Sequence, residues 1–334
     1  MDALKVSPQQ QMFSLVVGFW QSRALAIAVE LGVADILAER AMDVQELAAR
    51  TKTSASALHR LLRSLESIGV FSQQTEGLFC NSEASESLRE GLPGSQRSLI
   101  LSALSAGNGQ FEGWSKFEYA IQTGTPAFDK VHGCNFWEYG KRNPVAGRLF
   151  DDFMRSVSET MTSAITEAFD WSQFRTIVDV GGGIGTQLRS ILEAFPSVKG
   201  ILFDQPHVTS NAIPGERFQI QSGDFFESVP QGGDAYLLRW IIHDWSDEAA
   251  LAILKCVCKS FNPATRLVVV ESVVSEEPVF DMAKWLDLQM LAMLEGRERT
   301  EREYRSLLLA AGFELEQVIP TAAPVKILIA RLAE

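Results

Sequence analysis

The chain has 334 residues, a length that favours two domains at the usual domain size. A hydrophobic fraction of 46% with 22% charged residues is typical of a folded globular protein and excludes a disordered or collagen-like chain. The formal net charge of −12 argues against general nucleic-acid binding, because phosphate backbones attract basic surfaces.

The sequence gives little sign of disulfides, a zinc site, a signal peptide or a membrane helix. The four cysteines are too scattered for a disulfide scaffold, and the C-x-C pair Cys256 and Cys258 lacks the partners of a zinc site. The N-terminus lacks the pattern of a signal peptide, and no apolar run approaches the roughly 20 residues of a membrane helix. We therefore expect a cytoplasmic protein with no membrane partner.

Residues 8–37 are predicted to form a long helical stretch, because apolar side chains recur at three- and four-residue spacing. So much apolar surface must be covered, either by the same domain or by a second copy of the chain. Residues 38–91 have the pattern of a winged helix, with Asp43 as a helix cap. This motif often binds DNA, but glutamates follow its second helix closely, so a role in protein–protein contact is favoured.

Residues 92–170 are predicted to be mostly helical and are rich in aromatic side chains. Most of these belong in a core, as an aromatic stripe usually does, while a subset including Phe111 and Trp114 is a candidate lining for an apolar pocket.

From Thr176 onward, short β-branched runs alternate with helical segments, which predicts a doubly wound, Rossmann-like α/β sheet with a C-terminal β-hairpin. The predicted strands cover 176–180, 200–203, 217–221, 235–238, 266–271, 313–318 and 326–330. The expected organisation is a mainly helical winged-helix dimerisation domain, a helical linker that contributes to the substrate pocket, and a catalytic domain, over 1–95, 96–170 and 171–334.

A glycine-rich turn follows the first of these strands, as in nucleotide sites at the carboxyl edge of a parallel sheet. The dinucleotide fingerprint G-x-G-x-x-G would need a third glycine where the chain has Thr186. The sequence instead reads D-x-G-x-G-x-G from Asp179, through Gly181 and Gly183, to Gly185. This pattern resembles the first motif of class I S-adenosylmethionine methyltransferases.

Acidic residues also occur at the end of the second predicted strand and in the loop after the third. Asp204 is placed to bind the ribose hydroxyls of a nucleoside. Asp224 can accept a hydrogen bond from an adenine amine, and Phe225 can pack on the ring. Three such loops at successive strand ends favour a cofactor site over ordinary surface loops.

Methyl transfer to a hydroxyl needs a deprotonated oxygen, and a phenol titrates near ~10, so a general base is expected. Of the four histidines, His243 stands at the catalytic edge of the sheet, just past the strand that starts at Ala235. A carboxylate should orient its ring. Glu271, at the end of a buried strand, and Glu298, before a helix, are the candidates, although Glu298 could equally be an exposed helix-start acid.

The string H-D-W-S-D-E at 243–248 resembles the H-D-W-x-D-E motif of small-molecule O-methyltransferases. That family includes plant caffeate and flavonoid enzymes, acetylserotonin methyltransferase and many bacterial natural-product enzymes. Further similar segments occur in family order at 178–185, 203–208, 223–226, 296–300 and 310–313.

The resemblance implies a homodimer that uses S-adenosylmethionine, releases S-adenosylhomocysteine and needs no metal. It implies that His243 is the base, oriented by Glu271 and Glu298. Arg239 and Trp245 would join the cofactor residues, with arginine standing where many plant members carry lysine. The substrate positions implied are Met154, Asp287 and Met290, and the acceptor would be a phenolic or enolic hydroxyl of an aromatic small molecule in natural-product biosynthesis.

The sequence leaves several alternative functions open. An amine or a carboxylate could be the methyl acceptor. A relative on the same fold could bind the cofactor but perform decarboxylation, hydroxylation or cyclisation, because a fold does not fix a function. A winged-helix regulator that senses S-adenosylmethionine is a third possibility, against which the negative charge argues.

Overall fold

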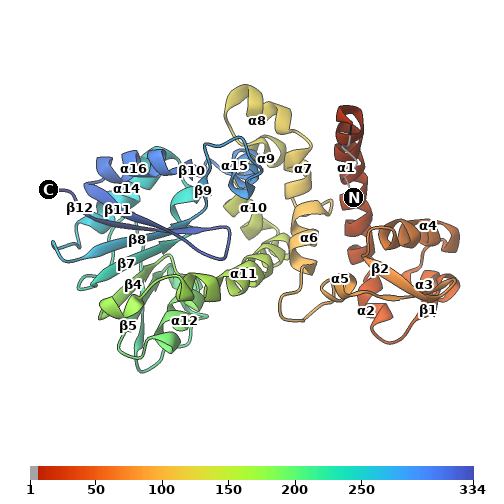
Figure 1. Cartoon of the computed structure of the whole chain (residues 1–334), viewed down its shortest axis with the longest axis horizontal. Coiled ribbons are helices and arrows are strands. Elements are labelled where there is room, and N and C mark those ends of the chain that lie inside the picture. Colours follow the sequence, from red (N-terminus) through yellow and green to blue (C-terminus); the bar gives the residue numbers. More distant parts are fainter. Residues whose placement is uncertain (1–6) are drawn as a thin grey trace. The chain divides into compact units, whose positions relative to one another are not determined.

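A computed structural model describes residues 7–334, except for the side chains of residues 159 and 160 (Figure 1). The chain divides into two compact units. Of the described residues, the first comprises 7–115 and Trp137–Val157, and the second comprises Lys116–Phe136 and Ser158–Glu334. The expected division at 95 and 170 stays a prediction.

The first unit contains the predicted winged-helix elements. Asp43 caps α3 (Val44–Thr51) by accepting a hydrogen bond from the Glu46 amide, as expected. α4 (Ala55–Glu66) follows, with Leu58, Leu62 and Leu65 buried. The strands form a three-stranded sheet in the order β1-β3-β2, over Met42–Asp43, Leu78–Asn81 and Phe71–Thr75.

The predicted helical stretch over 8–37 is interrupted. α1 (Pro8–Glu30) ends before Gly32, whose φ of 65° lies in the left-handed region, and α2 (Val33–Leu37) then starts in a new direction. The prediction was wrong here because the apolar spacing continues across a glycine that breaks the helix.

The C-terminal part of α1 packs into the core of its unit through Ala26, Ala28 and Val29. Its N-terminal part carries exposed large apolar side chains, namely Met12, Phe13, Leu15, Val16, Phe19 and Trp20. By length and composition α1 could cross a membrane, and 17% of its most apolar stretch is buried. This corrects the expectation that no segment approaches membrane length.

The remaining helices before the large sheet are short except for the last. In the first unit these are α5 (Glu83–Glu86), α6 (Arg97–Leu104) and α7 (Gln110–Trp114). In the second unit they are α8 (Phe117–Thr123) and α9 (Ala127–His132). α10 (Phe136–Arg142) and α11 (Pro144–Glu167) contribute residues to both units.

The second unit is built on a seven-stranded sheet in the order β11-β12-β8-β7-β4-β5-β6. The five parallel strands are β4 (Thr176–Val180), β5 (Lys199–Asp204), β6 (Phe218–Ser222), β7 (Ala235–Arg239) and β8 (Arg266–Glu271). β11 (Phe313–Pro320) and β12 (Lys326–Leu332) form the predicted antiparallel hairpin. The predicted doubly wound α/β fold is therefore confirmed.

Helices cover both faces of this sheet. α14 (Asp247–Cys258) and α16 (Glu301–Ala310) share one apolar core with β4, β7 and β8, while α12 (Thr186–Ala194) and the end of α11 pack on the other face. Each fully buried Leu, Ile or Val side chain contributes about 1.5–3 kcal/mol to folding. Between these helices and strands lie α13 (Pro206–Thr209), α15 (Met282–Met293) and a small parallel pair of strands, β9 (Val273–Val274) and β10 (Arg299–Thr300).

The strand order reverses between β4 and β7. At such a switch point the loops after neighbouring strands diverge to opposite faces and leave a crevice at the carboxyl edge, where ligands of open α/β sheets bind. The glycine loop follows β4 and the His243 loop follows β7, so both predicted site segments start at this point.

Candidate active site

The glycine loop after β4 is shaped for close approach by a ligand. Gly181 has a φ of 72°, and a side chain there would collide with Ile241. Gly183 has a φ of 64° and an added Cβ would meet no atom within 4 Å, so open space lies beside this backbone. The Gly183 amide donates to Asp204 Oδ2 at 2.8 Å.

Asp204 lies at the end of β5, as predicted, and is half-buried. Its Oδ1 accepts a hydrogen bond from the Gln205 amide at 2.7 Å. Burial raises the pKa of this carboxyl, and the backbone bonds from Gln205 and Gly183 oppose that rise. Asp204 therefore joins the glycine loop to the next strand end and keeps acceptor capacity on both oxygens.

Aromatic side chains from two further loops meet beside the glycine loop. Phe225 and Trp245 contact edge to face with ring centroids 6.1 Å apart, and a Cβ at Gly181 would lie 3.5 Å from the Phe225 ring. Asp224 Oδ1 accepts from the Phe226 amide at 2.8 Å, which fixes the turn that carries these rings. The structure thus places Phe225 next to both Gly181 and Trp245.

Arg239 is engaged in a way that the sequence did not indicate. Its guanidinium donates to Ser158 Oγ at 3.0 Å, to the Ser158 carbonyl at 3.1 Å and to Thr162 Oγ1 at 3.2 Å, all on α11. Burial lowers its pKa to about 10, and the nearby carboxyl of Asp179 opposes that change. Asp179 is itself buried, and burial raises its pKa to about 7.

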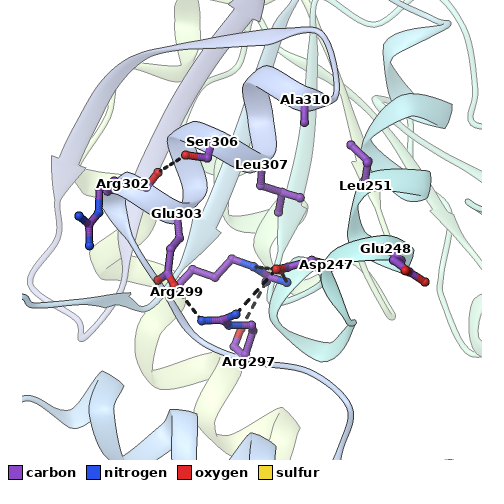
Figure 2. A pocket seen from close by; sticks show the side chains of 10 residues that line it. All are labelled: Asp247, Glu248, Leu251, Arg297, Arg299, Arg302, Glu303, Ser306, Leu307 and Ala310. Atoms are coloured by element: carbon purple, nitrogen blue, oxygen red, sulfur yellow. Dashed lines mark hydrogen bonds and ion pairs between the residues drawn. The ribbon is translucent and has the colours of Figure 1, made fainter.

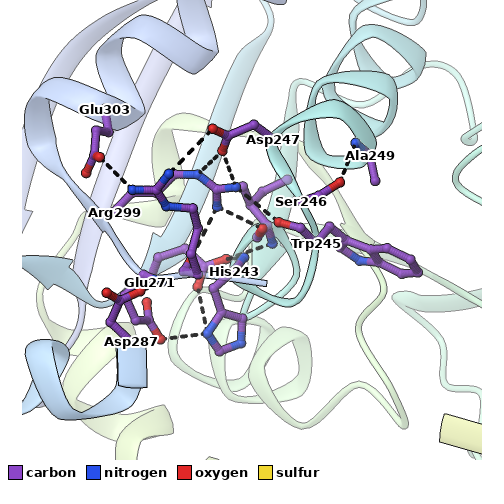
Figure 3. Close-up of polar contacts among 12 residues, drawn as sticks. His243, Trp245, Ser246, Asp247, Ala249, Glu271, Asp287, Arg299 and Glu303 are labelled. Atoms are coloured by element: carbon purple, nitrogen blue, oxygen red, sulfur yellow. Dashed lines mark hydrogen bonds and ion pairs between the residues drawn. The ribbon is translucent and has the colours of Figure 1, made fainter. Parts of the chain in front are cut away.

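His243 lies on the loop after β7, and its ring is paired with a carboxylate (Figure 3). Its Nδ1 is 2.8 Å from Glu298 Oε1. Glu298 is 2% exposed, so it is not an ordinary surface acid at the start of a helix. A carboxylate on Nδ1 fixes the proton there and leaves Nε2 as the basic nitrogen.

Glu271 acts mainly on the backbone of the same loop. Its Oε1 accepts from the amides of Ile241 at 3.1 Å and Ile242 at 2.9 Å, while its Oε2 lies 3.9 Å from His243 Nδ1. Of the two glutamates, Glu298 therefore contacts the ring directly and Glu271 holds the turn that carries it.

The charges around His243 change its proton affinity. Burial alone would lower its pKa, but the carboxylates of Glu271, Asp244 and Glu298 outweigh burial and raise the pKa to about 10. Burial raises the pKa of Glu271 to about 7. The cluster therefore stabilises a positive charge on the imidazole ring.

The same three side chains could also hold a divalent cation, because ligand atoms of His243, Glu271 and Glu298 lie within 4.8 Å of one another. The 2.8 Å contact of Nδ1 with Glu298 is that of a hydrogen bond, which accounts for the arrangement without an ion. Within residues 7–334, neither Cys256 nor Cys258 belongs to such a cluster.

The predicted substrate residues divide between the two units. Phe111 and Trp114 on α7 and Met154 on α11 belong to the first unit. Asp287 and Met290 on α15 belong to the second. Asp287 Oδ1 accepts from the Glu298 amide at 3.0 Å, a supporting contact that sequence reasoning missed. The pocket role of these five residues stays a prediction.

Comparison with protein families gives two matches that together span most of the chain. Residues 114–314 match the O-methyltransferase domain, and residues 13–90 match the O-methyltransferase dimerisation domain. The chain belongs to the O-methyltransferase family. The predicted resemblance is confirmed, and this protein is an S-adenosylmethionine-dependent O-methyltransferase.

Individual relatives cover nearly the full length of this O-methyltransferase. A phenazine O-methyltransferase of Lysobacter antibioticus is 37% identical over 329 residues, covering 96% of this chain and 95% of the relative. A phenazine-1-carboxylate N-methyltransferase of Pseudomonas aeruginosa is 31% identical, with 100% of both chains covered.

One similar solved structure is an O-methyltransferase from neocarzinostatin biosynthesis in complex with S-adenosylmethionine and 2-hydroxy-5-methyl naphthoic acid. It has a TM-score of 0.79 and 29% identity, and covers 93% of this chain and 96% of that one.

The match to a dimerisation domain includes most of α1. From Phe13 onward, the exposed apolar side chains on α1 of this O-methyltransferase thus lie within the residues that match the dimerisation domain, which suggests association of two copies.

Proposed function

We propose that this enzyme transfers a methyl group from S-adenosylmethionine to a phenolic or enolic hydroxyl of an aromatic small molecule, with His243 as general base. The observation that carries the proposal is the 2.8 Å pairing of His243 Nδ1 with the buried Glu298 carboxylate, on the loop that starts at the switch point of the sheet. Natural-product biosynthesis in the cytoplasm is the expected setting.

The residues at the strand ends fit the cofactor. Gly183 leaves open space beside the backbone, and Asp204 keeps acceptor capacity for two ribose hydroxyls. Asp224 would accept from the adenine amine, and Phe225 and Trp245 would pack near the ring. Gly181 would allow the chain to pass close to the cofactor, and Arg239 would contribute a cation near its carboxylate. When bound, the cofactor supplies a methyl group on a sulfonium, which needs no further activation.

What the chain must add is a deprotonated acceptor oxygen in the right place. A phenol titrates near ~10, and the carboxylates raise the pKa of His243 to about 10, so proton transfer between them is close to balanced. Nε2 would receive the proton, and Glu298 would stabilise the imidazolium that forms. This chemistry requires no metal, and we propose none.

N-methylation is a second candidate, because the N-methyltransferase relative aligns over the full length of both chains. A neutral amine already carries a lone pair and needs no base before attack. The buried His243–Glu298 pair is therefore better explained by a hydroxyl acceptor. A carboxylate acceptor is already deprotonated at pH 7 and needs no base, so it would not explain the His243–Glu298 pair either.

The test is transfer of isotope-labelled methyl from S-adenosylmethionine to a panel of phenols, hydroxyphenazines, hydroxynaphthoates and hydroxyquinones, with amine analogues as the matched control. We expect labelled O-methyl ethers, identified by mass spectrometry. Labelled product from the amines alone would support the N-methyl alternative. Binding of S-adenosylmethionine without any product across the panel would favour a non-methylating activity.

A further inference from the structure

Arg299 is a buried cation beside the His243 loop. It lies on β10, directly after Glu298, and is 1% exposed. Buried guanidinium groups are costly unless their hydrogen bonds are satisfied, so the contacts of this side chain show what it holds in place.

Its guanidinium donates to the loop on both sides of His243. Nη1 donates to the carbonyl of Ile242 at 3.0 Å and Nη2 to the carbonyl of Trp245 at 3.1 Å. Nε and Nη2 also donate to Asp247 Oδ1, at 2.9 and 2.7 Å (Figure 3). Asp247 begins α14, so one planar group joins both ends of the loop and the following helix.

The same loop is held from two further directions. Glu271 accepts hydrogen bonds from the amides of Ile241 and Ile242, while the Arg297 amide donates to the His243 carbonyl at 2.8 Å. Gly296 packs so closely that an added Cβ would collide with that carbonyl. The carbonyls of the loop thus depend on the 296–299 segment, and its amides depend on Glu271.

We propose that Arg299 is a positioning residue that holds His243 Nδ1 against Glu298. The inference rests on the proposed function, because it matters for catalysis only if His243 is the base. Glu298 and Arg299 are consecutive, so one residue supplies the ring's partner and the next fixes the loop that carries the ring. A shift of about 1 Å between Nδ1 and Oε1 would break the hydrogen bond and cost about 100-fold in rate.

A cavity and an exposed partner lie beside Arg299, so we expect the fold to tolerate its replacement. A cavity of about 470 Å³ between α14 and α16 borders Arg299, Asp247 and Leu307 (Figure 2). Asp247 is 60% exposed, so its carboxylate stays hydrated when the guanidinium is removed. Water that replaced the guanidinium could not hold the two freed carbonyls in one fixed geometry.

The experiment compares Arg299→Met with Arg302→Met in the full-length enzyme. Arg302 allows the same chemical change at a site that is 79% exposed, where the guanidinium forms an ion pair with Glu276. For Arg299→Met we expect kcat to fall about 10- to 100-fold while the S-adenosylmethionine Kd changes less than about threefold. Arg302→Met should match the wild type.

A positioning role also predicts a shift that a merely structural role would not give. Loss of the Glu298 contact lowers the pKa of His243, so the rise of kcat/KM with pH should move to lower pH in Arg299→Met. A folded variant with unchanged kcat and an unchanged profile overturns the proposal, as does a lower kcat with an unmoved profile.

Arg299→Lys serves if the methionine variant fails to fold. Lysine keeps the charge but cannot donate to two carbonyls and a carboxylate at once, so a reduced kcat with a shifted profile is expected. Full activity in this variant overturns the proposal. Failure of the proposed function is recognised separately, because His243→Ala would then retain full turnover whatever Arg299 variants do.

Discussion

The charge around His243 sets the expected pH dependence of the reaction. A base acts in its neutral form, and the surrounding carboxylates raise the pKa of His243 to about 10. The value of kcat/KM for a phenolic acceptor should therefore rise with pH towards about that value. Glu298→Gln removes one negative charge and lowers this pKa, so the rise should occur at lower pH and reach a lower plateau.

Comparison of pH–rate profiles for the wild type and Glu298→Gln tests this prediction. The acceptor's own titration is common to both enzymes and cancels in the comparison. Superimposable profiles would show that Glu298 does not control the proton affinity of the base.

Asp204 makes the corresponding prediction for cofactor binding. Asp204→Asn keeps one acceptor oxygen for the Gly183 amide but removes the charge that would bind two ribose hydroxyls. We expect the Kd for S-adenosylmethionine to rise about tenfold or more, which corresponds to about 1.4 kcal/mol, while kcat at saturation stays close to the wild-type value. Calorimetric titration measures this, with the exposed Glu216→Gln as the matched control. An unchanged Kd would place the ribose elsewhere.

At the scale of single residues, the sequence could select His243 and Glu298 as candidates but could not predict their geometry. The two are 55 residues apart, and their segments are brought together by contacts such as the two-residue pairing of β10 with β9, which has no sequence pattern of its own. Trp240 has a φ of 52°, so the backbone turns three residues before His243, and the Trp240 ring stacks on the His243 ring. A tryptophan rarely adopts a positive φ, so the sequence does not predict this turn. The sequence showed Arg299 only as a member of the family-like segment 296–300 and did not indicate its contacts with the His243 loop.

Among the secondary-structure elements, α1 carries the clearest prediction. Its exposed apolar side chains lie in the region that matches the dimerisation domain. Phe13, 62% exposed, and Trp20, 56% exposed, should be covered by a second copy, so Phe13→Glu with Trp20→Glu should give monomers. This variant is preferable to deletion of residues 1–35, because Ala26, Ala28 and Val29 belong to the core of the unit.

Light scattering after size exclusion gives the mass in solution. Leu309→Glu, at a 62% exposed position on α16 outside that domain, is the matched control and should leave the dimer intact. A stable dimer in the Phe13 and Trp20 double variant would move the interface to another surface.

The strands were the most predictable elements. The predicted bounds of β4 and β8 match the structure, because each is a short run rich in valine and other β-formers that is bounded by glycine or polar residues. The helical stretch over 8–37 was less predictable, since apolar spacing says nothing of a left-handed turn at Gly32. The high average hydropathy of α1 was not predicted either, because polar residues interrupt its apolar runs.

The molecule as a whole combines a winged-helix arrangement with a net charge of −12. Binding to DNA depends on neutralising phosphates with basic side chains, which this balance does not favour. We therefore expect no saturable binding to a mixed-sequence duplex at low salt, measured by fluorescence anisotropy. Saturable binding that weakens steeply with added salt would contradict this account and would support the hypothesis of a winged-helix regulator that senses S-adenosylmethionine.

At this largest scale the family and fold could be predicted, because the motifs occur in order along nearly the whole chain. The acceptor could not, because the expected pocket residues come from α7, α11 and α15, whose side chains do not form a sequence motif with a fixed chemical meaning. The membership of the two units could not be predicted, since residues 116–136 are helical but belong to the same unit as the large sheet.

The central claim is that His243 is the base for transfer to a hydroxyl. The most direct test is the turnover of His243→Ala against the wild type, with a phenolic acceptor from the panel and saturating S-adenosylmethionine, alongside the cofactor Kd of each enzyme. The account predicts that kcat falls by about 100-fold or more while the Kd stays unchanged. Near wild-type turnover in the variant, or a loss explained by weaker cofactor binding, would contradict it.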